Sequence, residues 1–542
     1  MIKKPLLVSL AAAALLTGNA QAASMFDRMS EMETEMQALK AELAEVKAAK
    51  AAVEDEAEEE KTAMKDEPEE DEGEEDEDED DEGGSDIEAQ LTELNKRTAG
   101  NALKFGVDFR TAVDNLQYKM ADGSKQENSA LFTNRLWLNM NWAANENMSF
   151  TGQLAYNKAY GARSGFSGQI AGMETFDWIT NENPYDDVVR VRSAYFFYRN
   201  DTFLGTDIPW TFSIGRRPST NGHLINMRDD DPAASPMGHT INVEFDGLSS
   251  KFTLMEDIGM YIKICAGRGG TNANAKFFGV LPGGYTDGSG NLIPAGTVVP
   301  GGAPYATTDD FPNIDLAGLI FVPYNDGQYT VNTQYYYAKN LIDAKIVPND
   351  PTNPMAGMSF QGMETVGNMH SFTANVVVNG IGDEWSDFLD DTTFFVSGAV
   401  SVTDPKDGEE MLGRDDSRTG YSYWAGLQFP SLISESGRWG VEWNRGTKFW
   451  RSVTYGEDTL AGSKIAARGD AYEAYFTEPL IDDIFSFQLR YTYIDYKWSG
   501  SNGFFGSATG TPYTISDMTP MDGSAYVVDT AQDIRAYLRY RF

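Results

Sequence analysis

Cysteine and histidine are nearly absent from this chain of 542 residues. The single cysteine, Cys265, has no partner for an internal disulfide, and there is no Cys-x-x-Cys-His haem motif and no cysteine-based zinc or iron–sulfur site. We interpret Cys265 as a small apolar side chain. The three histidines, His223, His239 and His370, lie far apart in the sequence, so we expect no metal, no cofactor and no histidine-based catalysis.

Long apolar runs are missing except at the start. Residues 1–22 have the order of a secretory signal peptide: two lysines, an apolar stretch at 6–16, and Ala20-Gln21-Ala22 before the predicted cleavage. The apolar stretch is shorter than the roughly 18 to 20 residues of a membrane anchor. No later stretch is apolar enough for a transmembrane helix, which excludes a helical inner-membrane protein and leaves the periplasm, the outer membrane or the medium.

Basic residues are in the minority. The chain has 43 Lys and Arg against 82 Asp and Glu, a net charge of -39, and residues 1–100 alone account for -20 of it. No basic face is available for phosphates, so nucleic acid is not expected as a partner. The acidic run at 54–84 repels itself and has too few apolar residues to fold, which predicts a disordered linker; weak binding of divalent cations is the alternative.

The segment before this linker has a heptad pattern. Within residues 23–53, apolar side chains are spaced alternately four and three apart, which predicts a periplasmic α-helical coiled coil. A single amphipathic helix lying on another surface is the alternative. The pattern includes Met25, Met29, Met32, Met36, Leu39, Leu43, Val46 and Val53, and its soft methionines leave the number of helices open. A further short helix is expected at residues 85–100.

From residue 101 to residue 542 the period changes to two. Apolar and polar residues alternate, most clearly in 132–142 and 533–542, as in strands with one apolar and one polar face. In a soluble sandwich the apolar face points inward, whereas in a membrane barrel it points to lipid. Expected strand lengths of roughly ten to twelve residues favour the barrel, because soluble strands usually have about five or six.

The expected connections also favour a membrane barrel, because short turns alternate with long loops. Short turns are expected at 324–327, 430–437 and 479–482, and long loops at 268–312, 341–368, 403–417, 448–465 and 499–531. The chain ends on Phe542, with Tyr540 two residues earlier, and a terminal aromatic after an alternating strand resembles the signal read by the bacterial barrel-assembly machinery.

These observations predict an all-β transmembrane protein, an antiparallel outer-membrane β-barrel of about 16 strands, within a range of 14–18, formed by residues 101–542. The expected strands start near residues 103, 129, 147, 187, 208, 241, 258, 313, 328, 369, 391, 418, 437, 466, 483 and 532. Trp142, Tyr198, Trp210, Trp424, Trp439 and Trp443 are expected in interfacial girdles, with packing between loops as the alternative.

A barrel of this size is too wide for its own side chains to fill, so it encloses water unless a loop or plug blocks it. Charges on opposed walls would then select solutes, although they could instead merely pair across strands. Arg216 and Arg217 precede a loop that we expect at the surface; folded into the pore, it would place them at a constriction. The candidate pore-lining residues are Arg110, Arg135, Arg190, Arg192, Arg216, Arg217, Arg490, Arg535, Arg539, Asp108, Glu442 and Glu473.

The signal peptide, the Met/Leu heptads and the segments 103–110, 152–161 and 215–219 resemble an uncharacterised family of Gram-negative outer-membrane porins with an N-terminal coiled coil. The resemblance covers nearly the whole mature chain. It implies the porin fold and a location in the outer membrane, with the N-terminal extension in the periplasm, but no substrate. The acidic run is long for such proteins.

The expected function is therefore passive diffusion of small hydrophilic solutes or ions, without enzymatic activity. The expected partners are outer-membrane lipid, the barrel-assembly machinery, two further copies in a homotrimer, and a periplasmic or cell-wall contact through the coiled coil. A non-conducting barrel, acting as a structural tether or as the sheath of an electron-transfer conduit, is the main alternative. An outer-membrane hydrolase would have to use His223 and His239 with the acids at 229–231.

Overall fold

The structure is a computed structural model. It describes residues 103–162, 184 and 188–542, except for residue 233, most of 272–312, and residues 350–351, 353–356, 383–384 and 455–456. The chain divides into two units, residues 1–87 and 88–542, and the description below concerns the second. The signal peptide, coiled coil, acidic linker and short helix predicted for 1–100 lie outside the described residues, where they stay predictions.

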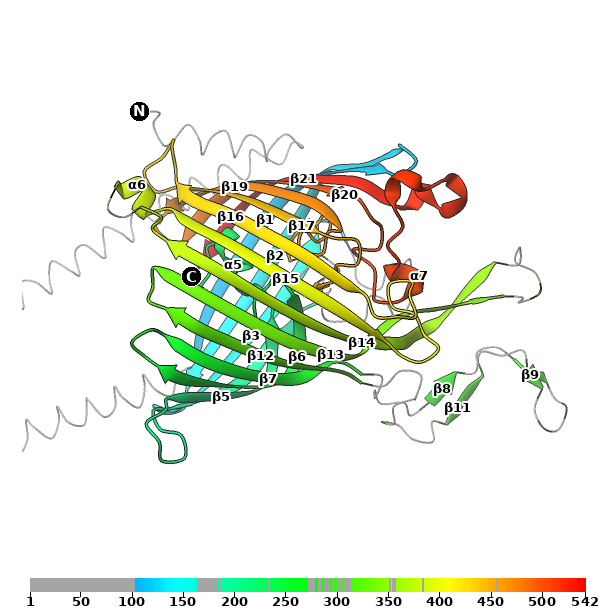
Figure 1. Cartoon of the computed structure of the whole chain (residues 1–542), viewed down its shortest axis with the longest axis horizontal. Helices are drawn as coiled ribbons and strands as arrows, with labels where there is room; N and C mark the ends of the chain where they lie inside the picture. The colour runs from blue at the N-terminus through cyan, green and yellow to red at the C-terminus, as the bar shows by residue number, and fades with distance from the viewer. Residues whose placement is uncertain are drawn as a thin grey trace, which may run out of the picture. The chain divides into compact units, whose positions relative to one another are not determined.

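Sixteen antiparallel strands form a closed barrel, and the last pairs with the first (Figure 1). The predicted fold class is confirmed. In chain order the barrel strands are β1 (Lys104–Met120), β2 (Lys125–Ala143), β3 (Met148–Ala159), β4 (Arg190–Asn200), β5 (Trp210–Ser219), β6 (Ile241–Met255), β7 (Met260–Gly270), β12 (Ile314–Asn325), β13 (Tyr329–Pro348), β14 (Met358–Asn379), β15 (Thr393–Pro405), β16 (Thr419–Pro430), β17 (Arg438–Gly446), β19 (Gly469–Ile481), β20 (Phe485–Tyr496) and β21 (Val528–Arg541).

The remaining elements lie in the connections. They are the short strands β8 (Phe278–Val280), β9 (Tyr285–Thr286), β10 (Leu292–Ile293), β11 (Val298–Pro300) and β18 (Val453–Thr454), the helices α5 (Ile225–Arg228), α6 (Asp387–Asp390) and α7 (Ser507–Gly510), and the 3-10 turns η2 (Ile515–Asp517), η3 (Pro520–Asp522) and η4 (Ser524–Tyr526). Among the described residues, no helix is long and apolar enough to span a membrane.

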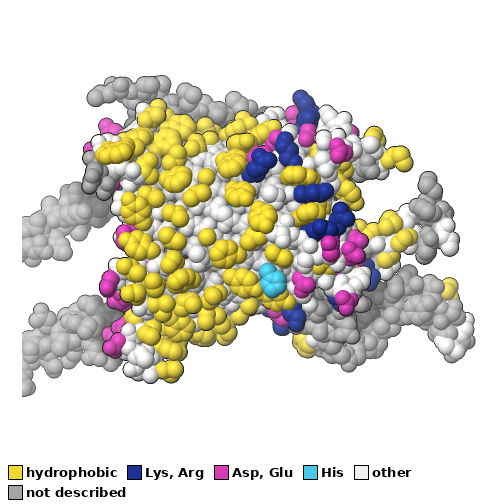
Figure 2. All heavy atoms as spheres, viewed as in Figure 1, with side chains coloured by type: hydrophobic (Ala, Val, Ile, Leu, Met, Phe, Trp, Pro, Cys, Tyr) yellow, Lys and Arg dark blue, Asp and Glu magenta, His cyan; other side chains and the backbone are white. Residues whose placement is uncertain are grey.

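The period of two sorts the side chains of each strand between the two faces of the wall. In β1, Phe105 and Phe109 are exposed on the outside, whereas Asp108 and Arg110 are buried inside. Figure 2 shows the result over one face of the barrel, a broad area of apolar side chains with charged side chains toward the two ends. A closed barrel with such an exterior has the construction of an outer-membrane barrel.

The two ends of the barrel differ in their connections. The connections at one end, which we call the short-turn end, have three to thirteen residues, for example 326–328 and 380–392, and the chain also finishes at this end. The opposite, long-loop end carries the longer connections, among them 220–240, 447–468 and 497–527, together with 406–418 and the short turn 121–124.

All barrel strands begin within four residues of the predicted starts except β14, which begins at Met358 instead of 369. The predicted loop at 341–368 is therefore wrong. β13 and β14 continue to pair beyond their neighbours and leave a connection of only 349–357. Three register shifts interrupt this extension, and because a bulge breaks the period of two, the alternation that reveals a strand is lost there.

Two long loops turn back into the barrel. Most described residues of 447–468 are buried, as are both ends of 220–240, and β18 of the first loop pairs in parallel with Ile241 and Asn242, the first two residues of β6. Residues 241–245 of β6 are buried on both faces for the same reason. The expectation that 220–240 is a surface loop is wrong, because its apolar and charged side chains both find partners inside.

Candidate functional site

Two regions of the barrel's inner surface, which together comprise eleven of the sixteen strands, differ chemically. We call β12–β16 the neutral wall, because its buried polar residues are Asn, Gln, Ser and Thr, apart from Asp343 in the extended outer part of β13. We call β17, β19, β20, β21, β1 and β2 the charged wall. Its buried residues include Asp108, Arg110, Asp114, Arg135, Glu442, Glu473, Arg490, Asp533, Arg535 and Arg539.

The neutral wall holds loop 220–240 mainly by apolar packing. Leu224 and Ile225 are fully buried against a cluster that includes Phe395 and Trp424 of the wall. Nearby, Gln334 accepts a hydrogen bond from the Met237 backbone N–H at 2.8 Å. Burying these apolar side chains contributes on the order of 1.5 to 3 kcal/mol each, so this part of the loop is firmly seated.

His239 is the polar centre of this contact. Its Nδ1 lies 2.7 Å from the Ser397 hydroxyl and its Nε2 lies 2.9 Å from the Ser422 hydroxyl, so both ring nitrogens are satisfied. The rings of Trp424 and Trp450 meet the imidazole edge to face. Burial lowers the pKa of His239 to about 3, so the imidazole is neutral at physiological pH.

The charged wall holds loop 447–468 through Asp458. The Asp458 carboxylate accepts a two-pronged pair of hydrogen bonds from Arg110, one of them at 2.7 Å, and lies 3.2 Å from Arg535. Its carbonyl oxygen accepts hydrogen bonds from Arg490 at 2.7 Å and Arg535 at 3.0 Å. Burial opposes the charge of Asp458, but the surrounding arginines outweigh it and hold the pKa of this carboxyl well below its usual range.

Glu473 of β19 joins both loops to the wall. Its carboxylate binds Arg228 of loop 220–240 at 3.2 Å, pairs closely with Lys464 of loop 447–468, and accepts the Thr492 hydroxyl at 2.8 Å. Lys464 also binds Glu442 of β17 at 2.7 Å. All of these side chains are buried, so each charge depends on the others for its neutralisation.

A second ionic contact holds loop 220–240 toward the short-turn end. Arg539 binds Asp108 across the strand pair and also donates to the Asp229 carbonyl at 2.7 Å and the Asp231 carboxylate at 2.9 Å. Arg541 lies 3.2 Å from Asp231. The acids at 229–231, considered above for a hydrolase, are therefore engaged with arginines of the wall.

Loop 497–527 closes the long-loop side. Arg451 donates to the backbone carbonyls of Ser501 and Gly503 at 2.6 Å each, and Arg468 donates to those of Ser499 and Gly510 at 2.9 and 2.7 Å. Burial and the neighbouring Arg451 lower the pKa of Arg468 to about 9. Loops 447–468 and 497–527 are thus bound by charge-assisted hydrogen bonds, which are stronger than neutral ones.

The candidate pore-lining residues fall into several groups. Arg110, Arg490, Arg535, Arg539, Asp108, Glu442 and Glu473 join in the network just described. Arg135 and Arg192 both contact the Trp137 ring, with their guanidinium carbons 3.6 and 4.2 Å from the ring centroid.

The other arginines lie apart from Asp458. Arg192 and Arg216 both face Glu244, Arg216 at 2.6 Å. Arg217 binds Ser213 and Ser249 and lies over the Tyr195 ring, and Arg190 is half-buried at the start of β4. The constriction by Arg216 and Arg217, which was the alternative to a surface loop, would therefore not lie where the loops meet the charged wall.

Sequence reasoning missed the loop residues that fill the lumen. Arg228, Asp458, Lys464, Arg451 and Arg468 were not singled out, because a loop sequence does not show which way the loop folds. The sequence does contain one signal of burial. Apolar residues, including Trp450, Ile465 and several alanines, lie next to these charges in the sequence, and such residues are usually buried.

Two further expectations concern aromatic residues. Trp424 does not belong to an outer girdle, because it is fully buried inside, where its indole N–H donates to Glu442 at 2.9 Å. Trp443 is exposed on the outside, as expected. Tyr540 and Phe542 are also exposed, and Phe542 pairs with the Val107 backbone by two hydrogen bonds of 2.8 Å, which places the terminal aromatics at the seam of the barrel.

The described residues contain no group of three or more His, Cys, Asp or Glu side chains that could hold a metal ion. The network holds its own acids and bases against one another at fixed positions. Arg490 and Arg535 of the wall are each only 1% exposed, so the lumen is filled at their level in this structure.

A family model matches residues 125–542, and the chain therefore belongs to the family described as protein of unknown function DUF3373. The predicted relationship to an uncharacterised family is confirmed. No curated protein matches the chain.

The chain is also similar to solved structures of outer-membrane proteins. OprB of Pseudomonas putida is 12% identical, with 84% of this chain and 97% of that chain covered and a TM-score of 0.42. OmpT of Vibrio cholerae, folded in vitro, is 12% identical, with 81% and 97% covered and a TM-score of 0.40. OmpF of Salmonella typhi, in complex with daunomycin, is 11% identical, with 82% and 99% covered and a TM-score of 0.40. The barrel fold stated above rests on the strand pairing itself.

Proposed function

We propose that this protein is a gated outer-membrane porin, in which loop 447–468 closes the lumen and its displacement from the charged wall opens a path for small hydrophilic solutes. The observation that carries the proposal is the set of polar contacts around Asp458, Lys464 and Glu473. Water and solute ions can replace such contacts when the loop moves.

The remaining wall supports the same function. Once the loop moves, Arg110, Arg490 and Arg535 face a water-filled space and oppose the neutral wall across it. The buried arginines and acids of the charged wall then place charges of both signs on one side of this space, which orders the water between the walls. The protein is not proposed as an enzyme, and the homotrimer, the assembly machinery and the periplasmic extension remain part of this proposal.

A non-conducting tether is the second candidate, because the lumen is filled at the level of Arg490 and Arg535. It differs from a gated porin in one measurable respect. If the loops serve only to seal the barrel, weakening their charged contacts yields no ion current.

Single-channel recording of the folded chain in a planar bilayer, with wild type and Asp458→Asn compared, tests the proposal. The asparagine leaves Arg110 and Arg535 buried without a full counter-charge, which costs about 3 to 5 kcal/mol. We expect brief, rare openings from the wild type and long openings from the variant. Asp529→Asn is the matched control, because Asp529 pairs with Lys119 outside the lumen at the long-loop end.

Silence of both folded proteins would overturn the porin and favour the tether. A wild type that is permanently open, with an unchanged Asp458→Asn variant, would keep diffusion but overturn closure by this loop.

A further inference from the structure

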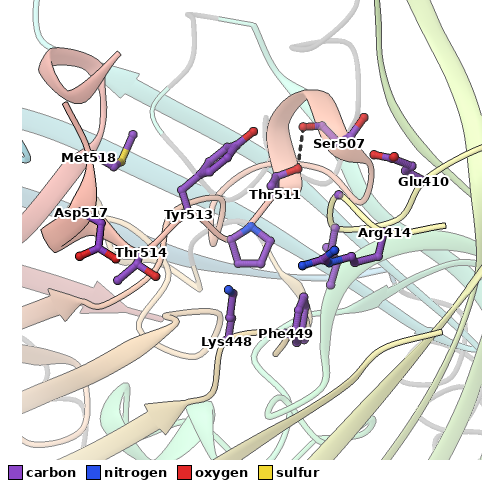
Figure 3. Close-up of a pocket in the computed structure, with 13 residues that line it drawn as sticks. Glu410, Arg414, Lys448, Phe449, Ser507, Thr511, Tyr513, Thr514, Asp517 and Met518 are labelled. Atoms are coloured by element: carbon purple, nitrogen blue, oxygen red, sulfur yellow. Dashed lines mark hydrogen bonds between the residues drawn. The ribbon is translucent and has the colours of Figure 1, made fainter. Parts of the chain in front are cut away.

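A cavity of about 520 Å³ opens at the long-loop end. Its walls come from three connections: loop 406–418, the start of loop 447–468, and loop 497–527 (Figure 3). The volume falls within the roughly 300 to 1,000 Å³ of small-molecule sites. None of the groups in the closed lumen network lines this cavity, so it is separate from the contacts that hold the loops.

Four charged side chains line the cavity, two of each sign. They are Glu410, Arg414, Lys448 and Asp517, and none of them makes an ion pair with another described residue. This differs from the lumen, where the buried charges are matched. Figure 3 shows Asp517 at one end of the cavity, Glu410 and Arg414 toward the other end, and Lys448 between Asp517 and Arg414.

Aromatic surface lies beside these charged side chains. Phe449 and Tyr513 contribute their rings, and Pro512 and Met518 add further apolar surface. Thr511 and Thr514 supply hydroxyl groups along the same wall. The lining thus offers cations for a carboxylate, anions for an ammonium group, and apolar surface for a side chain.

From this arrangement we propose that the cavity binds a small zwitterionic ligand, an amino acid or short peptide. Its carboxylate lies between Arg414 and Lys448, its ammonium group faces Asp517, and an apolar or aromatic side chain packs on Phe449 and Tyr513. A simple anion would meet Glu410 and Asp517, and a simple cation would meet Arg414 and Lys448, so a ligand with both charges fits the lining best.

The cavity is next to the loop that closes the lumen in the proposed function. Lys448 and Phe449 are among the first residues of loop 447–468, directly before Trp450 and Arg451, which anchor that loop. A ligand here occupies the entrance above the closed lumen. The inference therefore names the solute class of the proposed porin, but the binding itself does not require conduction.

Isothermal titration of the folded full-length chain in detergent tests the site. The probe is the dipeptide phenylalanyl-alanine, with its N-acetylated and C-amidated derivatives, each of which removes one charge. We expect the dipeptide to bind, and each derivative to bind about tenfold more weakly, because a charge-assisted hydrogen bond is lost. Arg414→Gln, Lys448→Gln and Asp517→Asn should each weaken the dipeptide by a similar factor.

Measuring each protein variant with each peptide derivative shows which side chain binds which charged group of the peptide. The amidated peptide should bind Lys448→Gln and wild type equally, because its carboxylate is already gone, and the acetylated peptide should do the same with Asp517→Asn. Lys406→Gln is the matched control, because Lys406 lies in loop 406–418 with Arg414 but does not line the cavity. This variant should bind the dipeptide as wild type does.

No binding to the folded wild type at millimolar dipeptide, or equal binding of all three peptides, would overturn the site. Because the titration uses no current, a silent channel that still binds the dipeptide would overturn the proposed porin and leave this inference standing.

Discussion

The neutral wall and the charged wall hold the same two loops by different means. On the neutral wall, Leu224 and Ile225 pack on Phe395 and Trp424, and His239 bonds to two serines without carrying charge. On the charged wall, Asp458 and Arg228 bind fully buried arginines and acids. The difference teaches that the loops pack on one wall as in a protein core and are held to the other by buried ion pairs. Under the proposed gating, the charged wall is where an opening would start.

The substitution expected to have the largest effect on stability is Glu473→Ala. Removing this carboxylate leaves Arg228 and Lys464 buried without their main partner, which should cost about 3 to 5 kcal/mol of stability. Ser397→Ala on the neutral wall removes one neutral hydrogen bond to His239 and should cost about 1 kcal/mol. Denaturant unfolding in detergent measures both, and equal losses would contradict the distinction between the walls.

Between pH 6.5 and 4, the contact of His239 with the neutral wall should nevertheless be the acid-sensitive one. His239 has a pKa of about 3 in the folded protein, below the roughly 6.5 of an unfolded histidine, so unfolding takes up a proton at pH values between these two. The stability it contributes is present above the unfolded pKa and is lost as pH falls, by about 1.4 kcal/mol per pH unit. His239→Gln should flatten the dependence of the unfolding midpoint on pH between 6.5 and 4; an unchanged slope would show that the imidazole is not buried as described.

The smallest expected effect concerns Glu457 in loop 447–468. Burial raises the pKa of this carboxyl, although the Ser463 hydroxyl and Lys464 act in the opposite direction. Its contribution to stability is therefore fully present below the unfolded pKa and is lost as pH rises through the folded pKa. Glu457→Gln resembles the protonated form and should stabilise the protein by up to about 1 kcal/mol at pH 8, with no gain at pH 4. A variant that destabilises at both pH values would show that the charge is fully compensated.

Much of the barrel could be predicted because its signal is local. Alternation within β1 and β21 already separates Asp108 and Arg535 from Phe109 and Ile534, and no distant information is needed for that. The prediction failed where local alternation is broken, at the bulges of β13 and β14. It also placed Trp424 on the wrong face, because a tryptophan near a strand end suits a girdle as well as an interior.

By itself, the sequence determined the barrel, its approximate strand number and the inward position of most of its arginines, since a period of two along each strand decides which side chains share a face. Only the tertiary structure decided that the lumen is filled and that its walls differ. Arg110 and Asp458 are separated by 348 positions in the sequence, and they meet because ring closure brings β1 beside β21 while loop 447–468 folds inward. Such a contact depends on the direction of a loop, which no local pattern of residues encodes.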